Sequence, residues 1–481
     1  MVFSSIVFLF YFLPIVLIGN YILCFSRRLQ NLWLFVTSIF FYAWGEPLYV
    51  AVLLLSICVN YVIGIIVSKY RDKNRNYAKF FVFIACLLNL SNLFIFKYLG
   101  FVIDMINEIV GKDIIVFEKL SMPIGISFFT FQALSYVIDI YRKDAEVQKN
   151  PILVGLYIAF FPQLVAGPIV RYKTIAEQMQ TRKFNINQFC TGICRFVVGL
   201  SKKILLANNL AIIVDNIYNL TETGKHLYDV SISMAWLGSI AYTLQIYMDF
   251  SGYSDMAIGL GQMFGFQFEE NFNYPYITKS ISEFWRRWHI SLSTWFKEYV
   301  YFPLGGSRVK NKDKMIRNLL IVWLLTGIWH GASMTFIAWG LYNFIFIFCE
   351  RLIGFDKKNS HPVLRHIYAL VIINFGWVLF RSDDFYVLSQ YLSNMFGLNN
   401  NSFYSNETGM IIREYALVLI ASIVFSMPTS KIIRAKIQKS KNKLLVLGMR
   451  VGYPVALTCT ISLCVLCLVK GGYNPFIYFN F

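Results

Sequence analysis

One histidine of this chain lies where an ionisable side chain is rare. The chain has five histidines, and His330 falls within Leu319–Cys349, a stretch without Asp, Glu, Lys or Arg. Placing an ionisable group at membrane depth costs free energy, so such a residue favours a functional role. An imidazole titrates near neutral pH and is suited to take a proton from a reacting hydroxyl. We predict that His330 is a general base; the alternative is a neutral imidazole bonded to a carbonyl.

Basic residues on both sides of this stretch predict how His330 is held. They are Arg317, Arg351, Lys357 and Lys358. Because Lys and Arg favour the cytoplasmic side of a membrane, a single crossing would place one flank on the opposite side. We therefore expect a broken or re-entrant pair of helices, with the break at His330–Ser333. Non-helical backbone at membrane depth survives only beside protein or a water-filled cavity, so we expect His330 to line a cavity.

A second histidine, His289, stands in the segment SISEFWRRWHISLSTWFKEYVYFPLGG. This mixture of Trp, Arg and Lys is typical of an amphipathic segment at a membrane interface. One interpretation makes His289 an interface anchor, and the other makes it a second catalytic or donor-positioning histidine. Arg286 and Arg287 beside it are suited to bind a phosphate-rich donor such as coenzyme A, because guanidinium groups match phosphate geometry.

A catalytic role is not favoured for the other three histidines. His226 lies in the short loop TETGKHLYDV and is expected to be a solvated residue. His361 and His366 flank Pro362 at the entrance of an apolar window, where an interfacial role is favoured over catalysis.

A polar cluster, YMDFSGYSDMAIGLGQMFGF, closes an apolar window and is the third candidate site. Its polar side chains are Asp249, Ser251, Tyr253, Ser254 and Asp255. Two carboxylates in such a place need cationic partners, which we expect the Arg-rich block that follows to supply. An ion-pair cluster that ends a helix and the lining of a substrate tunnel both fit. The chain lacks a GxSxG elbow, a P-loop and a dinucleotide fingerprint.

The elements that hold these residues are expected to be membrane-spanning helices. The chain is 57% hydrophobic and only 15% charged, with a mean hydropathy of +0.55. Windows able to cross about 30 Å of hydrocarbon recur along it. Examples are Val2–Cys24, Val50–Ser68, Phe80–Phe96, Val230–Met248 and Val451–Val469. We expect an all-α polytopic membrane protein with about 10–13 transmembrane or re-entrant helices, forming a single domain over residues 1–481.

The net charge of +18 is interpreted as membrane topology rather than nucleic-acid binding. Basic residues gather in short loops, which the positive-inside rule places in the cytoplasm. Arg27 and Arg28 after the first window put the N-terminus outside. The blocks Lys279–Arg317 and Lys431–Lys443 are also expected to be cytoplasmic, which leaves the C-terminus outside. Cys464 and Cys467 form a CxxC pair without a nearby histidine, so no metal site is expected.

Several of these segments resemble a known family. WRRWHISLSTWFKEYVYFPLGG and NLLIVWLLTGIWHGAS are similar to the core of the membrane-bound O-acyltransferases, especially the bacterial alginate O-acetyltransferase branch. Further stretches match that branch in order: Pro123–Arg142, Phe161–Tyr172, Gln245–Gly259, Phe375–Ser382 and Asn474–Phe481. Since these blocks span nearly the whole chain, the resemblance is far more specific than a lone histidine.

The resemblance implies a ring of transmembrane helices around a central cavity, with funnels on both faces. His330 would be the catalytic histidine and His289 the second signature histidine. To a substrate or donor tunnel we assign Gln132, Asp249, Ser251, Tyr253, Asp255, Arg286, Arg287 and Trp329.

The resemblance also implies a reaction. An acetyl group would pass from acetyl-CoA or another cytoplasmic acyl thioester across a bacterial cell membrane, for O-acetylation of an exported cell-surface polysaccharide. No cofactor would be bound. The expected partners are an exported acetyltransferase protein or a polysaccharide synthase complex, together with the lipid bilayer and no nucleic acid. D-alanyl transfer to teichoic acid, peptidoglycan O-acetylation, a lipid-linked sugar transporter and a recruiting scaffold stay open as alternatives.

Overall fold

The computed structural model describes residues 1–118, 120–222, 227–309, 311–355, 361–440, 442–475 and 477. Within these ranges every regular element is a helix, and no β-strand occurs. The predicted all-α fold is therefore confirmed. The predictions made for His226, Lys357, Lys358 and the last residues of the block Asn474–Phe481 fall outside the described ranges.

The chain folds as two compact units. The first comprises Met1–Phe196 and Ser254–Glu270, and the second comprises Val197–Tyr253 and Asn271–Phe481. The first unit holds η1 (Phe8–Phe12), α1 (Leu13–Ile22), η2 (Leu23–Phe25), α2 (Arg27–Gly45), α3 (Val50–Tyr70), α4 (Arg75–Leu93), η3 (Phe94–Tyr98), α5 (Leu99–Val110), α6 (Ile126–Arg142), α7 (Pro151–Ala159), α8 (Phe161–Leu164), α9 (Tyr172–Ile175), α10 (Gln178–Thr181), the start of α11 (Ile186–Ser201) and the end of α13 (Ile232–Met263).

The second unit continues α11 and holds most of α13. Its other helices are η4 (Lys202–Ala207), α12 (Asn208–Glu222), η5 (Pro275–Ile277), α14 (Ile281–Arg287), α15 (Ile290–Phe296), η6 (Lys297–Tyr301), α16 (Lys312–His330), α17 (Met334–Leu352), α18 (Pro362–Arg381), α19 (Phe385–Phe396), α20 (Asn406–Phe425), α21 (Thr429–Lys439) and α22 (Lys443–Val469). That residues 1–481 form a single domain stays a prediction.

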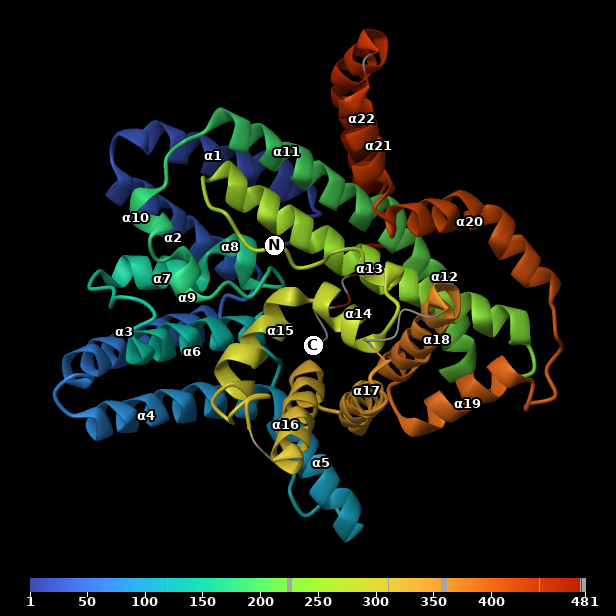
Figure 1. Ribbon diagram of the computed structural model, residues 1–481, viewed down its shortest axis with the longest axis horizontal. Coiled ribbons are helices and arrows are strands. Elements are labelled where there is room, and N and C mark those ends of the chain that lie inside the picture. Colours follow the sequence, from blue (N-terminus) through green and yellow to red (C-terminus); the bar gives the residue numbers. More distant parts are fainter. Residues whose placement is uncertain are drawn as a thin grey trace. The chain divides into compact units, whose positions relative to one another are not determined.

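In the first unit, α3, α4 and α6 lie side by side (Figure 1). A buried amide pair joins α3 to α4: Asn60 Nδ2 donates to Asn89 Oδ1 at 3.1 Å, and Asn89 Nδ2 donates to Asn60 Oδ1 at 2.8 Å. Helix contacts among apolar surroundings gain from such bonds, because lipid offers these amides no alternative partner. The pair therefore fixes the register of the two helices.

The helix break predicted at His330 is confirmed. α16 ends at His330, and α17 begins at Met334 and packs back along α16 in the second unit (Figure 1). Glycines allow this close approach: a Cβ atom on Gly327 would collide with the carbonyl oxygen of Phe336, and one on Gly340 with that of Trp323. The turn is stabilised by Ser333, whose Oγ accepts the backbone N–H of Thr335 at 3.3 Å.

Among the described residues, eight helices or continuous helix runs are long and apolar enough to cross a membrane. They are Phe8–Phe25, Val50–Tyr70, Arg75–Val110, Ile186–Glu222, Met334–Leu352, Pro362–Arg381, Asn406–Phe425 and Arg450–Val469. The chain is thus a multi-pass membrane protein. α13 and α16 are not among the eight, because polar residues interrupt α13 and charged residues begin α16. The ring of helices around a central cavity stays a prediction.

Candidate active site

His330 lies inside an aromatic enclosure at the end of α16, where it is 2% exposed. Its ring centroid lies 4.9 Å from that of Trp329, 5.0 Å from Trp339 and 5.2 Å from Phe380, each in an edge-to-face arrangement. Trp339 belongs to α17 and Phe380 to α18, so three helices hold the imidazole. Aromatic walls of this kind fix the ring and keep bulk water away from it.

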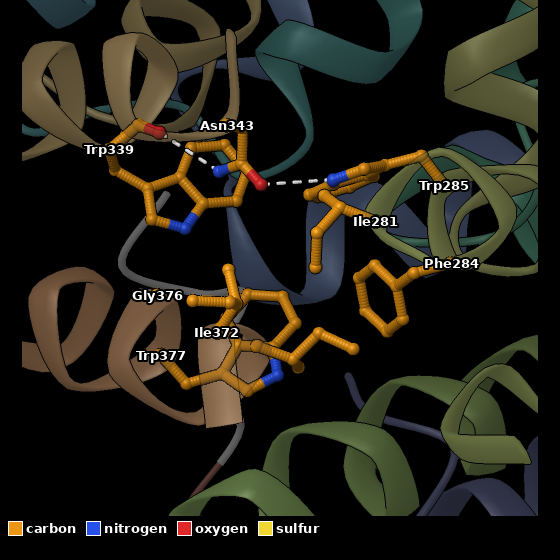
Figure 2. Close-up of a pocket in the computed structure, with 9 residues that line it drawn as sticks. Ile281, Phe284, Trp285, Trp339, Asn343, Ile372, Gly376 and Trp377 are labelled. Atoms are coloured by element: carbon orange, nitrogen blue, oxygen red, sulfur yellow. Dashed lines mark hydrogen bonds between the residues drawn. The ribbon is translucent and has the colours of Figure 1, made fainter. Parts of the chain in front are cut away.

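Trp339 also lines a narrow pocket between α14, α17 and α18 (Figure 2). The pocket is lined by Ile281, Phe284, Trp285, Trp339, Asn343, Ile372, Ile373, Gly376 and Trp377. The Asn343 amide is used within the wall: Oδ1 accepts from Trp285 Nε1 and Nδ2 donates to the Trp339 carbonyl, both at 2.9 Å. The wall of the pocket is therefore built mostly from aromatic and aliphatic side chains, with the Asn343 amide already paired inside it. His330 does not line this pocket. Its ring packs against Trp339, which does.

His289 lies in the tight turn between α14 and α15. Its backbone adopts φ 44° and ψ 54°, in the left-handed region that non-glycine residues rarely occupy. Such local strain persists where the surrounding structure enforces it. His289 is only 1% exposed, whereas an interface anchor keeps its polar end in water. The interface-anchor interpretation therefore does not fit the structure.

The contacts of His289 are one amide and two aromatic rings. Its Nδ1 lies 3.1 Å from Asn271 Oδ1, and its ring centroid lies 4.7 Å from that of Phe250. The Trp329 ring is 6.0 Å away. Burial lowers the pKa of His289 to about 3, so the imidazole is neutral at physiological pH. Because Trp329 contacts both His289 and His330, the structure brings these three predicted residues together in the second unit.

The segment that carries His289 is anchored by an acid that the sequence analysis did not single out. Glu350, near the end of α17, is 3% exposed, and its two carboxylate oxygens accept the backbone N–H groups of Ile281 at 2.6 Å and Ser282 at 2.9 Å. These are the first residues of α14, where unpaired N–H groups and the helix dipole favour a negative charge. An acid at the end of a long uncharged stretch was the signal in the sequence.

The partners of Asp249 and Asp255 differ from those predicted. Asp249 Oδ1 pairs with Lys203 Nζ at 2.7 Å, and both side chains are at most 3% exposed. Asp255 pairs with Arg195 at 3.0 Å. Both cations lie on α11 or η4, not in the Arg-rich block after residue 279, so that prediction was wrong. The acids also do not end a helix, because α13 continues to Met263.

The cation of the buried pair, Lys203, lies in the π-helical turn η4 at Lys202–Ala207. Such turns are often found at functional sites. The C-terminal segment adds two hydrogen bonds: Lys203 Nζ donates to the Pro475 carbonyl, and Ile477 N donates to Asp249 Oδ2 at 3.0 Å. The Asp249 carboxylate is thus held in a structural network, which favours the ion-pair interpretation over a tunnel lining for this residue.

The other residues predicted to line a tunnel lie on different helices and differ in burial and in hydrogen-bond partners. Ser251 and Tyr253 are buried on α13. Arg287 is bound to Glu283 at 2.9 Å and to the Asn273 carbonyl at 3.1 Å, while Arg286 is exposed. Gln132 lies on α6 in the first unit, where it is fully buried and neither side-chain amide atom has a hydrogen-bond partner among the described residues. Their assignment to a tunnel stays a prediction.

Comparison with known proteins agrees with this geometry. Residues 122–380 match the family model of the membrane-bound O-acyltransferases. A probable alginate O-acetylase of Azotobacter vinelandii is 36% identical, and the alignment covers 100% of each chain. The chain belongs to the membrane-bound O-acyltransferase family. A peptidoglycan O-acetyltransferase of Helicobacter pylori is 34% identical over 90% of this acyltransferase and 87% of its own length. A teichoic acid D-alanyltransferase of Bacillus subtilis is 30% identical over 55% of this acyltransferase and 68% of its own length.

The role of Glu350 in this acyltransferase can be tested by a change of one atom. Glu350→Gln removes the charge and one of two acceptors for the N–H groups of α14. We expect the free energy of unfolding to fall by about 1.5–3 kcal/mol, the range for a hydrogen bond to a charged group. Acetyl transfer should fall with it, because α14 leads directly to His289. Thermal unfolding followed by Trp fluorescence measures the first effect.

Glu407 provides the matched control, since it lies in the first turn of α20 but is exposed. Glu407→Gln should leave both unfolding and activity unchanged. Equal effects of the two changes would show that the Glu350 carboxylate has no special role in α14.

Proposed function

We propose that this acyltransferase passes an acetyl group from acetyl-CoA across the cytoplasmic membrane of a bacterium, for O-acetylation of an exported cell-surface polysaccharide. The proposal is carried by a buried histidine at a helix break in a chain that aligns over its full length with a probable alginate O-acetylase. The D-alanyltransferase relative aligns over a smaller part, which favours acetyl over D-alanyl transfer.

His330 would serve as the general base. One of its ring nitrogens takes the proton of the accepting hydroxyl as the oxygen attacks the thioester carbonyl. A carbon–oxygen bond forms, the carbon–sulfur bond breaks, and the thiolate leaves with the proton from the imidazolium. The rings of Trp329, Trp339 and Phe380 exclude water, which would otherwise compete with the hydroxyl. Arg286, exposed on α14, is suited to bind donor phosphates.

The basic blocks give the proposed orientation. Lys279–Arg317 and Lys431–Lys443 lie in the cytoplasm, so acetyl-CoA enters there, and both termini lie outside. Handing the group to a polymer outside the cell calls for a second protein. We expect an exported acetyltransferase or a polysaccharide synthase complex to be that partner.

Deleting the gene separates the candidate acceptors. We expect the deletion strain to lose ester-linked acetate, released by mild alkali, from its exported polysaccharide, and a plasmid copy to restore it. Loss of acetate from peptidoglycan, or of D-alanine from teichoic acid, with the exported polysaccharide unchanged would contradict the proposed acceptor. An unchanged content of all three esters would contradict acyl transfer to these polymers.

A further inference from the structure

The turn that carries His289 defines the hydrogen position on its imidazole. One side-chain atom of Asn271 lies 3.1 Å from His289 Nδ1, 3.2 Å from the backbone N of Ser291 and 2.9 Å from Ser291 Oγ. A backbone N–H only donates, so the Asn271 atom that it meets must be the carbonyl oxygen and not the amide nitrogen. Oxygen accepts from all three groups, and His289 Nδ1 therefore carries a hydrogen.

The other ring nitrogen is then a bare acceptor. A neutral imidazole has a single N–H, so a hydrogen on Nδ1 leaves the lone pair of Nε2 available to accept a hydrogen bond. Nε2 is buried and has no hydrogen-bond partner among the described residues. Buried polar atoms in proteins nearly always have one, and an orphaned acceptor at a functional site is suited to a ligand's donor.

The surroundings of His289 keep this acceptor neutral and oriented. Burial away from water lowers its pKa, which favours the neutral imidazole. Its neighbours are Phe250, Trp329, Asn271 and Ser291, with His330 as the titratable group beyond Trp329. The backbone adds a further restraint, because Ile290 N donates to the Asn271 carbonyl at 3.0 Å. Asn271 thus binds three successive residues, including the one in the left-handed conformation.

We infer that Asn271 is a positioning residue that holds His289 in the Nδ1–H tautomer, with Nε2 directed to accept a hydrogen bond from the substrate hydroxyl. This role rests on the proposed acyl transfer and gives the two histidines different functions. His330 removes the proton, and His289 fixes the hydroxyl that loses it. Asn271 touches no reacting atom and acts only through His289.

The tautomer can be measured without any substrate. The purified protein is labelled with ¹⁵N-histidine, and its five imidazoles are observed by solid-state NMR at pH 7 in lipid. The signals missing from the His289→Gln variant belong to His289. We expect a protonated Nδ1 and an unprotonated Nε2. A hydrogen on Nε2, or on both nitrogens, would overturn the inference, whatever the activity of the protein.

Two substitutions then test the function of the bond. Asn271→Leu should lower acetyl transfer by roughly 10–100-fold, the usual effect of removing a partner that orients an imidazole. Asn271→Asp keeps an oxygen acceptor and should restore much of the rate at high pH. Its carboxylate also stabilises the imidazolium and raises the pKa of His289, so activity should be lost as the pH falls, where the wild type stays active.

Asn273→Leu is the matched control, since this side chain is exposed two residues away. It should leave the rate and the pH profile unchanged. Equal loss of activity in the Leu and Asp variants of Asn271, with an unchanged pH profile, would contradict the positioning role. Absence of acetyl transfer by the wild type would instead contradict the proposed function, while the NMR result stands by itself.

Discussion

Replacing His330 with alanine is expected to lower the rate of acetyl transfer by roughly 10²–10⁴-fold, the usual contribution of a general base. The imidazole is the titratable group inside the enclosure of Trp329, Trp339 and Phe380, and alanine cannot accept a proton. The rate is measured as thiol released from acetyl-CoA by the purified protein in the presence of acceptor. The amount of folded protein, measured by size-exclusion chromatography, should stay close to that of the wild type.

Two further variants separate chemistry from packing. His330→Gln fills most of the space of the imidazole and should be as inactive as the alanine variant. His361→Asn changes an exposed histidine at the start of α18, where asparagine tolerates the left-handed backbone, and should retain full activity. Wild-type rates in both His330 variants would exclude this residue as the base.

Breaking the Lys203–Asp249 pair is expected to have the largest effect on stability. Asp249→Leu leaves a buried ammonium without its carboxylate, and removing one partner of a buried pair costs about 3–5 kcal/mol. The double variant Lys203→Met/Asp249→Leu removes both charges and should recover most of this loss. Thermal unfolding of the purified protein, followed by intrinsic fluorescence, compares the two variants with the wild type.

The control for this comparison is Asp72→Asn, which removes an exposed carboxylate from the ion pair with Lys143. Surface pairs of this kind contribute little to stability, so its unfolding transition should coincide with that of the wild type. A double variant that unfolds as early as the single one would show that the loss comes from altered packing rather than from an unpaired charge.

The helix break at His330 could be predicted because its signals are local. Arg317 and Arg351 flank a stretch without charge, and the residues His330-Gly331-Ala332-Ser333 offer a place to end one helix and begin the next. The same kind of pattern placed the window Val50–Ser68 within two residues of α3. The length of an apolar stretch and the positions of the charges beside it depend only on residues that are neighbours in the chain, so they can be predicted without knowing the fold.

Contacts between residues far apart in the chain could not be predicted from such local patterns. The partner of Asp249 is Lys203, 46 residues earlier in the chain. It lies on a π-helical turn that neither composition nor residue spacing predicts. Glu350 and Asn271 were missed for a related reason, because each acts on backbone N–H groups that a sequence pattern does not display. An ionisable residue such as Lys203 within an apolar window was nevertheless a signal of a buried pair.

The most direct test of the account is acetyl transfer by the purified acyltransferase in proteoliposomes of known orientation. Radiolabelled acetyl-CoA is supplied only to the face that carries Lys279–Arg317, and labelled acetyl ester is measured on acceptor polysaccharide and partner protein enclosed on the opposite face. We predict labelled ester with the wild type and almost none with His330→Ala. Equal labelling by both proteins, or labelling only when donor and acceptor share one face, would contradict transfer across the membrane through His330.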